Sequence, residues 1–155
     1  MKTIMKLGLG ILVLGLVSCQ LVDFEEAALK TTDDTPLVDT EWDLVSFEEM
    51  GDGESEAGSV GILLILEEGG QVKGESYQNA GGPPAANKFF GIYELKADSQ
   101  LEIDSLRSTF VNEPTGSRYE QFLAALENAA GYELDEDDLR IQSETGNILI
   151  FKARE

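Results

Sequence analysis

The chain has 155 residues, with 11 lysines and arginines against 30 aspartates and glutamates, and its formal net charge at pH 7 is −19. This charge excludes nucleic-acid binding, which needs basic side chains that displace counterions from phosphates, and it disfavours adsorption to anionic lipid headgroups. Histidine is absent and cysteine occurs once, which excludes Ser-His and Cys-His nucleophile pairs, an internal disulfide and an ordinary zinc site.

Residues 1–18 have the pattern of a secretory signal. Lys2 and Lys6 form a short basic start, and residues 7–17 are apolar apart from glycines. This run is too short to span a bilayer as a helix, which takes about 20 residues. A basic start, a short apolar stretch and small residues before a cleavage site are typical of an exported precursor.

The residues at the predicted cleavage site resemble a bacterial lipobox. Leu16, Val17, Ser18 and Cys19 are an apolar residue, two permissive positions and a cysteine. The resemblance implies a diacylglycerol on Cys19, cleavage before it and acylation of the new amino terminus, with palmitate expected, so that two or three acyl chains hold the protein to a lipid bilayer. Gln20 stands where an aspartate often retains lipoproteins in the inner membrane, which implies the outer membrane. The alternatives are an ordinary cleaved signal with an incidental cysteine, or a buried apolar helix.

The segment that follows is acidic and threonine-rich up to Pro36, and it has little to bury. Such a composition predicts a tether. We therefore expect a signal peptide at residues 1–18, a lipidated acidic tether at 19–36 and one folded domain at 37–155, since domains commonly span about 100–150 residues.

Short apolar or alternating segments predict β-strands through the folded part. Residues 40–44 alternate polar and apolar side chains, whereas residues 60–66 are almost wholly apolar, as in a strand covered on both faces or in a central strand. Gly69 and Gly70 predict a tight hairpin turn, and the acidic, glycine-rich residues 48–59 predict a loop. The other strands are expected at residues 71–77, 88–95, 101–103, 132–134, 139–141 and 148–151.

One amphipathic helix is predicted near the C-terminal end. Ser117 and Glu120 have the S-x-x-E spacing of a capping box, and Gly131 supplies a stop. Its apolar face comprises Tyr119, Phe122, Leu123 and Leu126. Because no βαβ repetition is present, we expect an α+β fold, in which a small, mostly antiparallel, half-barrel-like β-sheet packs against this helix.

The order of the motifs between Leu37 and Phe151 resembles that of the META domain. The motifs are T-x-W-x-L at residues 40–44, N-x-x-x-G-x-Y at 87–93, the pair Ser108-Thr109, a helix with F-L-x-x-L at 119–126 and a closing hairpin at 139–151. META domains, including the heat-shock HslJ-like proteins, are small envelope-associated domains, often on lipoproteins. The family is linked to heat shock, novobiocin resistance and, in distant members, motility or secretion, and the resemblance implies no particular enzymatic reaction.

The resemblance singles out Asn87, Gly91, Tyr93 and Thr109 as family-pattern residues. They are predicted to form a shared binding surface or, alternatively, to have turn and packing roles. Asn79 competes with Asn87 for the motif position, because a segment with two glycines and two prolines separates them.

The chain also departs from the family pattern. Many members have one cysteine just before the asparagine and another after the Ser-Thr pair. Here Ala86 takes the first place and Val111 or Asn112 the second. Any disulfide that the pattern implies is therefore missing.

The densest acidic run is Asp135 to Asp138. Calcium prefers several carboxylate oxygens, but the glycine and the distal glutamate of an EF-hand loop are absent. A solvated hairpin turn is the favoured interpretation, and the same holds for the acids of residues 48–56.

We expect a non-catalytic domain without cofactor or metal, because neither a nucleophile elbow nor a glycine-rich phosphate loop is present. The leading hypothesis is a lipid-anchored envelope protein whose domain binds another envelope component or supports envelope integrity under stress. One alternative is a small-ligand or cation-binding module, suggested by the acids and by Phe89, Phe90 and Tyr93. Another is an enzyme that uses paired carboxylates.

Overall fold

The computed structural model describes residues 35–49, 53–56, 58, 60–78, 87–109 and 116–155. The predicted leader, Cys19 and most of the predicted tether lie outside these residues. Thr31–Glu155 form one compact unit. Within the described segments, no helix has the length and hydrophobicity needed to cross a bilayer.

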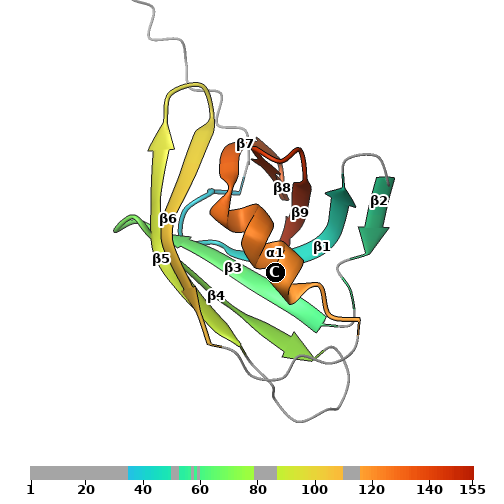
Figure 1. Ribbon diagram of the computed structural model, residues 1–155. Helices are drawn as coiled ribbons and strands as arrows, with labels where there is room; N and C mark the ends of the chain where they lie inside the picture. Colours follow the sequence, from blue (N-terminus) through green and yellow to red (C-terminus); the bar gives the residue numbers. More distant parts are fainter. Residues whose placement is uncertain (1–34, 50–52, 57, 59, 79–86, 110–115) are drawn as a thin grey trace, which may run out of the picture. The chain divides into compact units, whose positions relative to one another are not determined.

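The described residues contain nine strands and one helix. They are β1 (Glu41–Glu49), β2 (Gly53–Glu56), β3 (Val60–Glu67), β4 (Gln71–Gln78), β5 (Lys88–Lys96), β6 (Gln100–Ser108), α1 (Tyr119–Glu127), β7 (Ala129–Asp135), β8 (Asp138–Ser143) and β9 (Ile148–Ala153). Eight strands form a closed antiparallel ring in the order β1-β3-β4-β5-β6-β7-β8-β9, because β9 pairs with β1 (Figure 1). The remaining strand, β2, lies within the predicted 48–59 loop and pairs with the end of β1.

The expected α+β fold, in which a half-barrel-like sheet packs against one helix, is therefore wrong, since the strands close into an antiparallel β-barrel that is accompanied by one short helix among the described residues. The first residues of β1 pair with β3 on one side, while β1 pairs with β9 on the other side over Trp42–Glu48. The β1–β9 register shifts between Leu44 and Ser46, and such a bulge bends a strand. Closure pairs the backbone groups that an open sheet leaves free at its two edges. Periodicity along the chain does not reveal this pairing between its first and last strands.

Apolar side chains fill the interior of the barrel. In β3, Ile62, Leu64 and Leu66 are fully buried, Leu63 is buried and Ile65 is partly buried, and the strand lies between β1 and β4, which confirms a central strand. The largest fully buried side chains are Trp42, Phe47, Phe89, Tyr119, Phe122 and Phe151. The rings of Phe89 and Phe122 meet edge to face, with centroids 5.3 Å apart.

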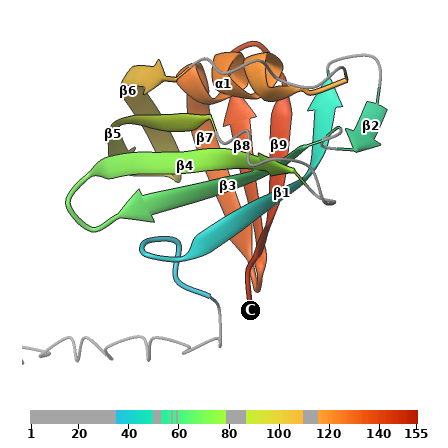
Figure 2. The same cartoon turned by 90° about the horizontal axis from the view of Figure 1, so that it is seen from below.

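Helix α1 lies across one end of the barrel and contacts β6, β8 and β9 (Figure 2). Tyr119, Phe122 and Leu126 of the predicted apolar face are buried, whereas Leu123 is only partly buried. The N-cap is Arg118, whose side chain makes no cap hydrogen bond, and not Ser117 as the predicted capping box requires; the Ser117 hydroxyl still accepts from the Tyr119 amide at 3.2 Å. Gly131 does not end the helix either. It lies in β7, and the C-cap is Asn128, whose side-chain amide donates to the Ala124 carbonyl.

The segment before β1 lies at the opposite end of the barrel from the helix (Figure 2). The Trp42 indole N–H donates to the Leu37 carbonyl at 3.1 Å, and Leu37 belongs to the core cluster. The Asp39 amide donates to the Leu66 carbonyl at 2.7 Å. These contacts fix the segment to the barrel, with only 9% of Leu37 exposed.

Candidate functional site

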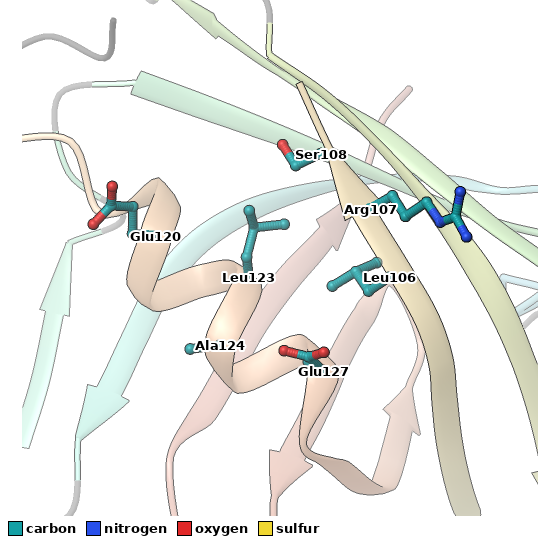
Figure 3. Close-up of a pocket in the computed structure, with 7 residues that line it drawn as sticks. All are labelled: Leu106, Arg107, Ser108, Glu120, Leu123, Ala124 and Glu127. Atoms are coloured by element: carbon teal, nitrogen blue, oxygen red, sulfur yellow. The ribbon is translucent and has the colours of Figure 1, made fainter. Parts of the chain in front are cut away.

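A groove of about 710 Å³ lies on the barrel between α1 and β6. It is lined by Leu106, Arg107 and Ser108 from β6 and by Glu120, Leu123, Ala124 and Glu127 from α1 (Figure 3). We call it the α1–β6 groove. It opens at the surface, where the helix crosses the end of the barrel beside the strand.

The floor of the α1–β6 groove is apolar and part of its border is acidic. Leu106 and Leu123 are partly buried against the core and point toward each other in Figure 3. Glu120 and Glu127 are exposed on the helix and lie seven residues apart, which corresponds to about 10 Å along a helix axis. Arg107 points away from the groove in the same view. The groove therefore suits an apolar group that carries positive charge.

The Ser108-Thr109 pair links three elements at one end of the groove. The Ser108 and Tyr119 hydroxyl oxygens are 2.8 Å apart, which joins β6 to the start of α1. The Lys88 amide donates to the Thr109 hydroxyl at 2.9 Å, and the Thr109 amide donates to the Lys88 carbonyl at 2.9 Å. Thr109 therefore extends the pairing between β5 and β6 beyond the end of β6.

Asn87 is almost completely buried, with 1% of its surface exposed. Its amide donates to the Ser76 hydroxyl at 3.1 Å, and its carbonyl accepts from the Ser76 amide at 2.8 Å. Asn87 thus joins the start of β5 to β4. The alternative Asn79 lies outside the described residues.

Gly91 lies where the β5–β6 register shifts, and it permits a close backbone approach. A Cβ at Gly91 would be 3.0 Å from the Asp104 carbonyl oxygen and 3.2 Å from the Leu106 Cα. The Tyr93 hydroxyl donates to the Glu67 carbonyl at 2.8 Å. Burial and then the Asp39 carboxylate raise the pKa of the Tyr93 phenol.

The family-pattern residues Asn87, Gly91, Tyr93 and Thr109 are thus distributed along β5 and the end of β6, and none of them lines the α1–β6 groove. Each makes a backbone or packing contact in the described structure. These contacts agree with the turn and packing roles that the sequence offers as the alternative to a shared binding surface.

The acidic run is the turn between β7 and β8. Lys152 forms an ion pair with Asp138 at 2.8 Å, and the Asp137 carbonyl accepts from the Ala153 amide at 2.8 Å. A shallow hollow of about 270 Å³ beside the turn is lined by three acids and Arg140. Among the described residues, no group of three or more His, Cys, Asp or Glu side chains is arranged to hold a metal ion.

Sequence reasoning did not identify the α1–β6 groove. Leu106 lies beyond the strand predicted at 101–103, since β6 extends to Ser108. Glu120 and Glu127 do not stand out in the sequence, because the chain has 30 acidic residues. One usable signal was present: Leu123 is at the edge of the predicted apolar face, next to Ala124 and between these two glutamates.

The META domain model matches residues 35–155 of the chain. The fold is similar to the NMR structure of a protein from Burkholderia xenovorans, with a TM-score of 0.56 and 24% identity, covering 76% of this chain and 83% of that one. A crystal structure of a DUF4847 family protein from Bacteroides vulgatus gives a TM-score of 0.47 and 16% identity, covering 75% of this chain and 93% of that one. No curated protein sequence matches the chain. The family match spans every described strand and the helix, and the chain therefore belongs to the META domain family.

Proposed function

We propose that this protein is a lipid-anchored component of the bacterial cell envelope, and that its META domain is a non-catalytic binding module for another envelope component. The α1–β6 groove carries the proposal. In this groove the domain binds a segment of a partner protein that combines an apolar side chain with basic ones. Acylated Cys19 holds the domain at the outer membrane.

The composition of the α1–β6 groove supports a basic, apolar segment. Leu106 and Leu123 offer an apolar floor, and Glu120 and Glu127 add two acidic side chains from helix positions about 10 Å apart along the axis. An extended segment turns alternate side chains to the same face, so an apolar side chain flanked by basic ones at every second position can face the groove. The excess of acids, 30 against 11 basic residues in the chain, favours a basic partner over an acidic one.

A non-catalytic role is supported by the side chains that the sequence lacks. Without histidine, and with its one cysteine at the predicted lipidation site, the chain has no Ser-His or Cys-His pair. Hydrolase or transferase activity that depends on a specific carboxylate would contradict this part of the proposal.

The experiment is crosslinking capture of the intact lipoprotein from its own envelope. The groove variant is Glu120→Lys with Glu127→Lys, and the matched control is Glu94→Lys with Glu133→Lys, which makes the same charge change at exposed sites outside the groove. We expect a partner protein that is lost in the groove variant and retained in the control. Equal loss in both variants would show that overall charge, and not the groove, holds the partner.

The anchor is tested separately with Cys19→Ala. We expect the wild-type chain in the detergent phase of a Triton X-114 extract and labelled by alkyne-palmitate, and the variant unlabelled. Equal labelling of both chains would refute lipidation at Cys19, without affecting the test of the groove.

A further inference from the structure

The outer face of β5 exposes two large apolar side chains. Phe90 is 53% exposed and Ile92 is 58% exposed. They are two residues apart in one strand and therefore lie on the same face of the barrel wall. Neither belongs to the α1–β6 groove or to the core cluster.

Basic residues surround Phe90 on this face. Lys88 lies two residues before it in β5, Lys73 is its register partner in β4, and Arg107 is its register partner in β6. Side chains at such positions are nearest neighbours on one face of a sheet. On a chain with 30 acids, this arrangement places three cations next to one exposed aromatic ring.

Two of these cations are not neutralised by the described part of the chain. Lys73 pairs with Glu67, whereas neither Lys88 nor Arg107 has a carboxylate within 4.0 Å among the described residues. Every other described lysine or arginine forms an ion pair, namely Lys96, Arg118, Arg140, Lys152 and Arg154. The unpaired positive charge in this part of the molecule is therefore concentrated at the two sides of Phe90.

A hollow of about 390 Å³ lies beside Phe90 on the same wall. Leu63 and Ile65 of β3 line it together with Phe90, and its charged lining consists of Lys73, Lys88 and Glu75. Glu75 is the register partner of Lys88 but forms no ion pair with it. The hollow thus joins an apolar surface to a cation that has no partner.

We propose that this hollow binds an anionic amphiphile, which is a molecule with one alkyl chain and a phosphate or carboxylate head group. The alkyl chain lies against Leu63, Ile65 and Phe90, and the head group pairs with Lys88. A neutral amphiphile would leave Lys88 unpaired, and a cationic one would be repelled by it. The net charge of the chain does not prevent binding, because exposed charges beyond about 8 Å are largely screened at physiological ionic strength.

The experiment uses residues 19–155 with Cys19→Ala, which retain the whole compact unit Thr31–Glu155. Decyl phosphate, kept below its micelle concentration, is titrated into the protein while backbone amide NMR shifts are recorded. Decyltrimethylammonium is the probe with the opposite charge. We expect decyl phosphate to shift the amides of β3, β4 and β5, and decyltrimethylammonium to shift them weakly.

The variants separate the two parts of the site. We expect Lys88→Glu to raise the dissociation constant for decyl phosphate about fivefold, since an ion pair becomes a repulsion, and Phe90→Ser to raise it about tenfold through lost apolar contact. The matched controls are Lys152→Glu and Val45→Ser, which change exposed residues elsewhere. Their dissociation constants should equal that of the wild type, and an unchanged far-UV circular dichroism spectrum verifies the fold of each variant.

Three results would overturn the proposal. The first is equal affinity for the two probes, because the site would then not select an anion. The second is an effect of the control variants as large as that of Lys88→Glu or Phe90→Ser. The third is binding to phosphatidylglycerol vesicles without binding to dispersed decyl phosphate, because the face would then recognise a bilayer surface and not a single amphiphile. Since Glu120 and Glu127 lie outside this hollow, none of these results bears on the α1–β6 groove.

Discussion

Replacement of Gly74 in β4 by alanine should destabilise the barrel strongly. A Cβ at this position would be 2.3 Å and 2.7 Å from Cζ and Cε1 of Phe89, and 1.9 Å from the carbonyl oxygen of Leu63. Phe89 is 1% exposed and its ring packs against Phe122, so a shift of the ring disturbs the packing of the core. The Leu63 carbonyl belongs to the neighbouring strand β3, so the clash between this oxygen and the added Cβ can be removed only if the backbone moves.

The magnitude follows from overpacking of a filled core. One extra methyl group in a well-packed interior costs about 1–3 kcal/mol, occasionally more. Because both a buried ring and a backbone oxygen obstruct Gly74→Ala, we expect a loss of about 3 kcal/mol in the free energy of unfolding. Gly69→Ala is the matched control, since a Cβ there meets no atom within 4 Å. We expect Gly69→Ala to change stability by less than about 0.5 kcal/mol.

The assay is urea unfolding followed by the fluorescence of Trp42, the chain's one tryptophan, which is fully buried. The variant Phe89→Leu removes the ring atoms that obstruct a Cβ at Gly74. In a double-mutant cycle, we therefore expect the Gly74→Ala Phe89→Leu protein to be more stable than the sum of the single changes predicts, by about 1 kcal/mol. A Gly74→Ala protein within about 0.5 kcal/mol of the wild type would refute the close packing of Gly74 against Phe89 and the Leu63 carbonyl.

Two further changes test contacts at the barrel wall. Burial raises the pKa of the Tyr93 phenol above its usual value, so the folded state holds this proton more tightly than the unfolded state, and stability is lost as the pH rises through the folded pKa. Between pH 9 and 11 we expect the urea midpoint of the wild type to fall more than that of Tyr93→Phe, and parallel curves would contradict this reasoning. Arg154 donates to both carboxylate oxygens of Asp43, at 2.8 Å and 2.6 Å, and lies over the ring of Tyr77. Arg154→Lys keeps the charge but loses the bidentate geometry, so we expect the free energy of unfolding in urea to fall by about 0.5–1 kcal/mol. An unchanged free energy of unfolding would mean that this ion pair adds little to stability.

The α1–β6 groove could not be predicted from the sequence, because tertiary structure alone brings its two sides together. Leu123 belongs to the predicted helix face, yet only the position of β6 shows that it faces Leu106 across a hollow. The basic face around Phe90 could not be predicted from the sequence for the same reason. Phe90 was recognised as an aromatic residue, but Lys73 and Arg107 lie next to it only because β4 and β6 pair with β5 in a particular register.

Periodicity, turn residues and short motifs predicted eight of the nine described strands, the helix and the family, because such patterns are local or keep their order along the chain, whereas β2 lies in a segment predicted as a loop. The sequence also made the buried apolar strand β3 and the Gly69-Gly70 turn predictable. Closure of the barrel was decided only by tertiary structure. The pairing of Leu44 with Phe151 joins the two ends of the folded part, and no local pattern reports a contact between strands that are so far apart in the chain. That one pairing converts the expected open sheet into a ring with a filled interior, which leaves the outer wall and the capped end as the surfaces available for binding.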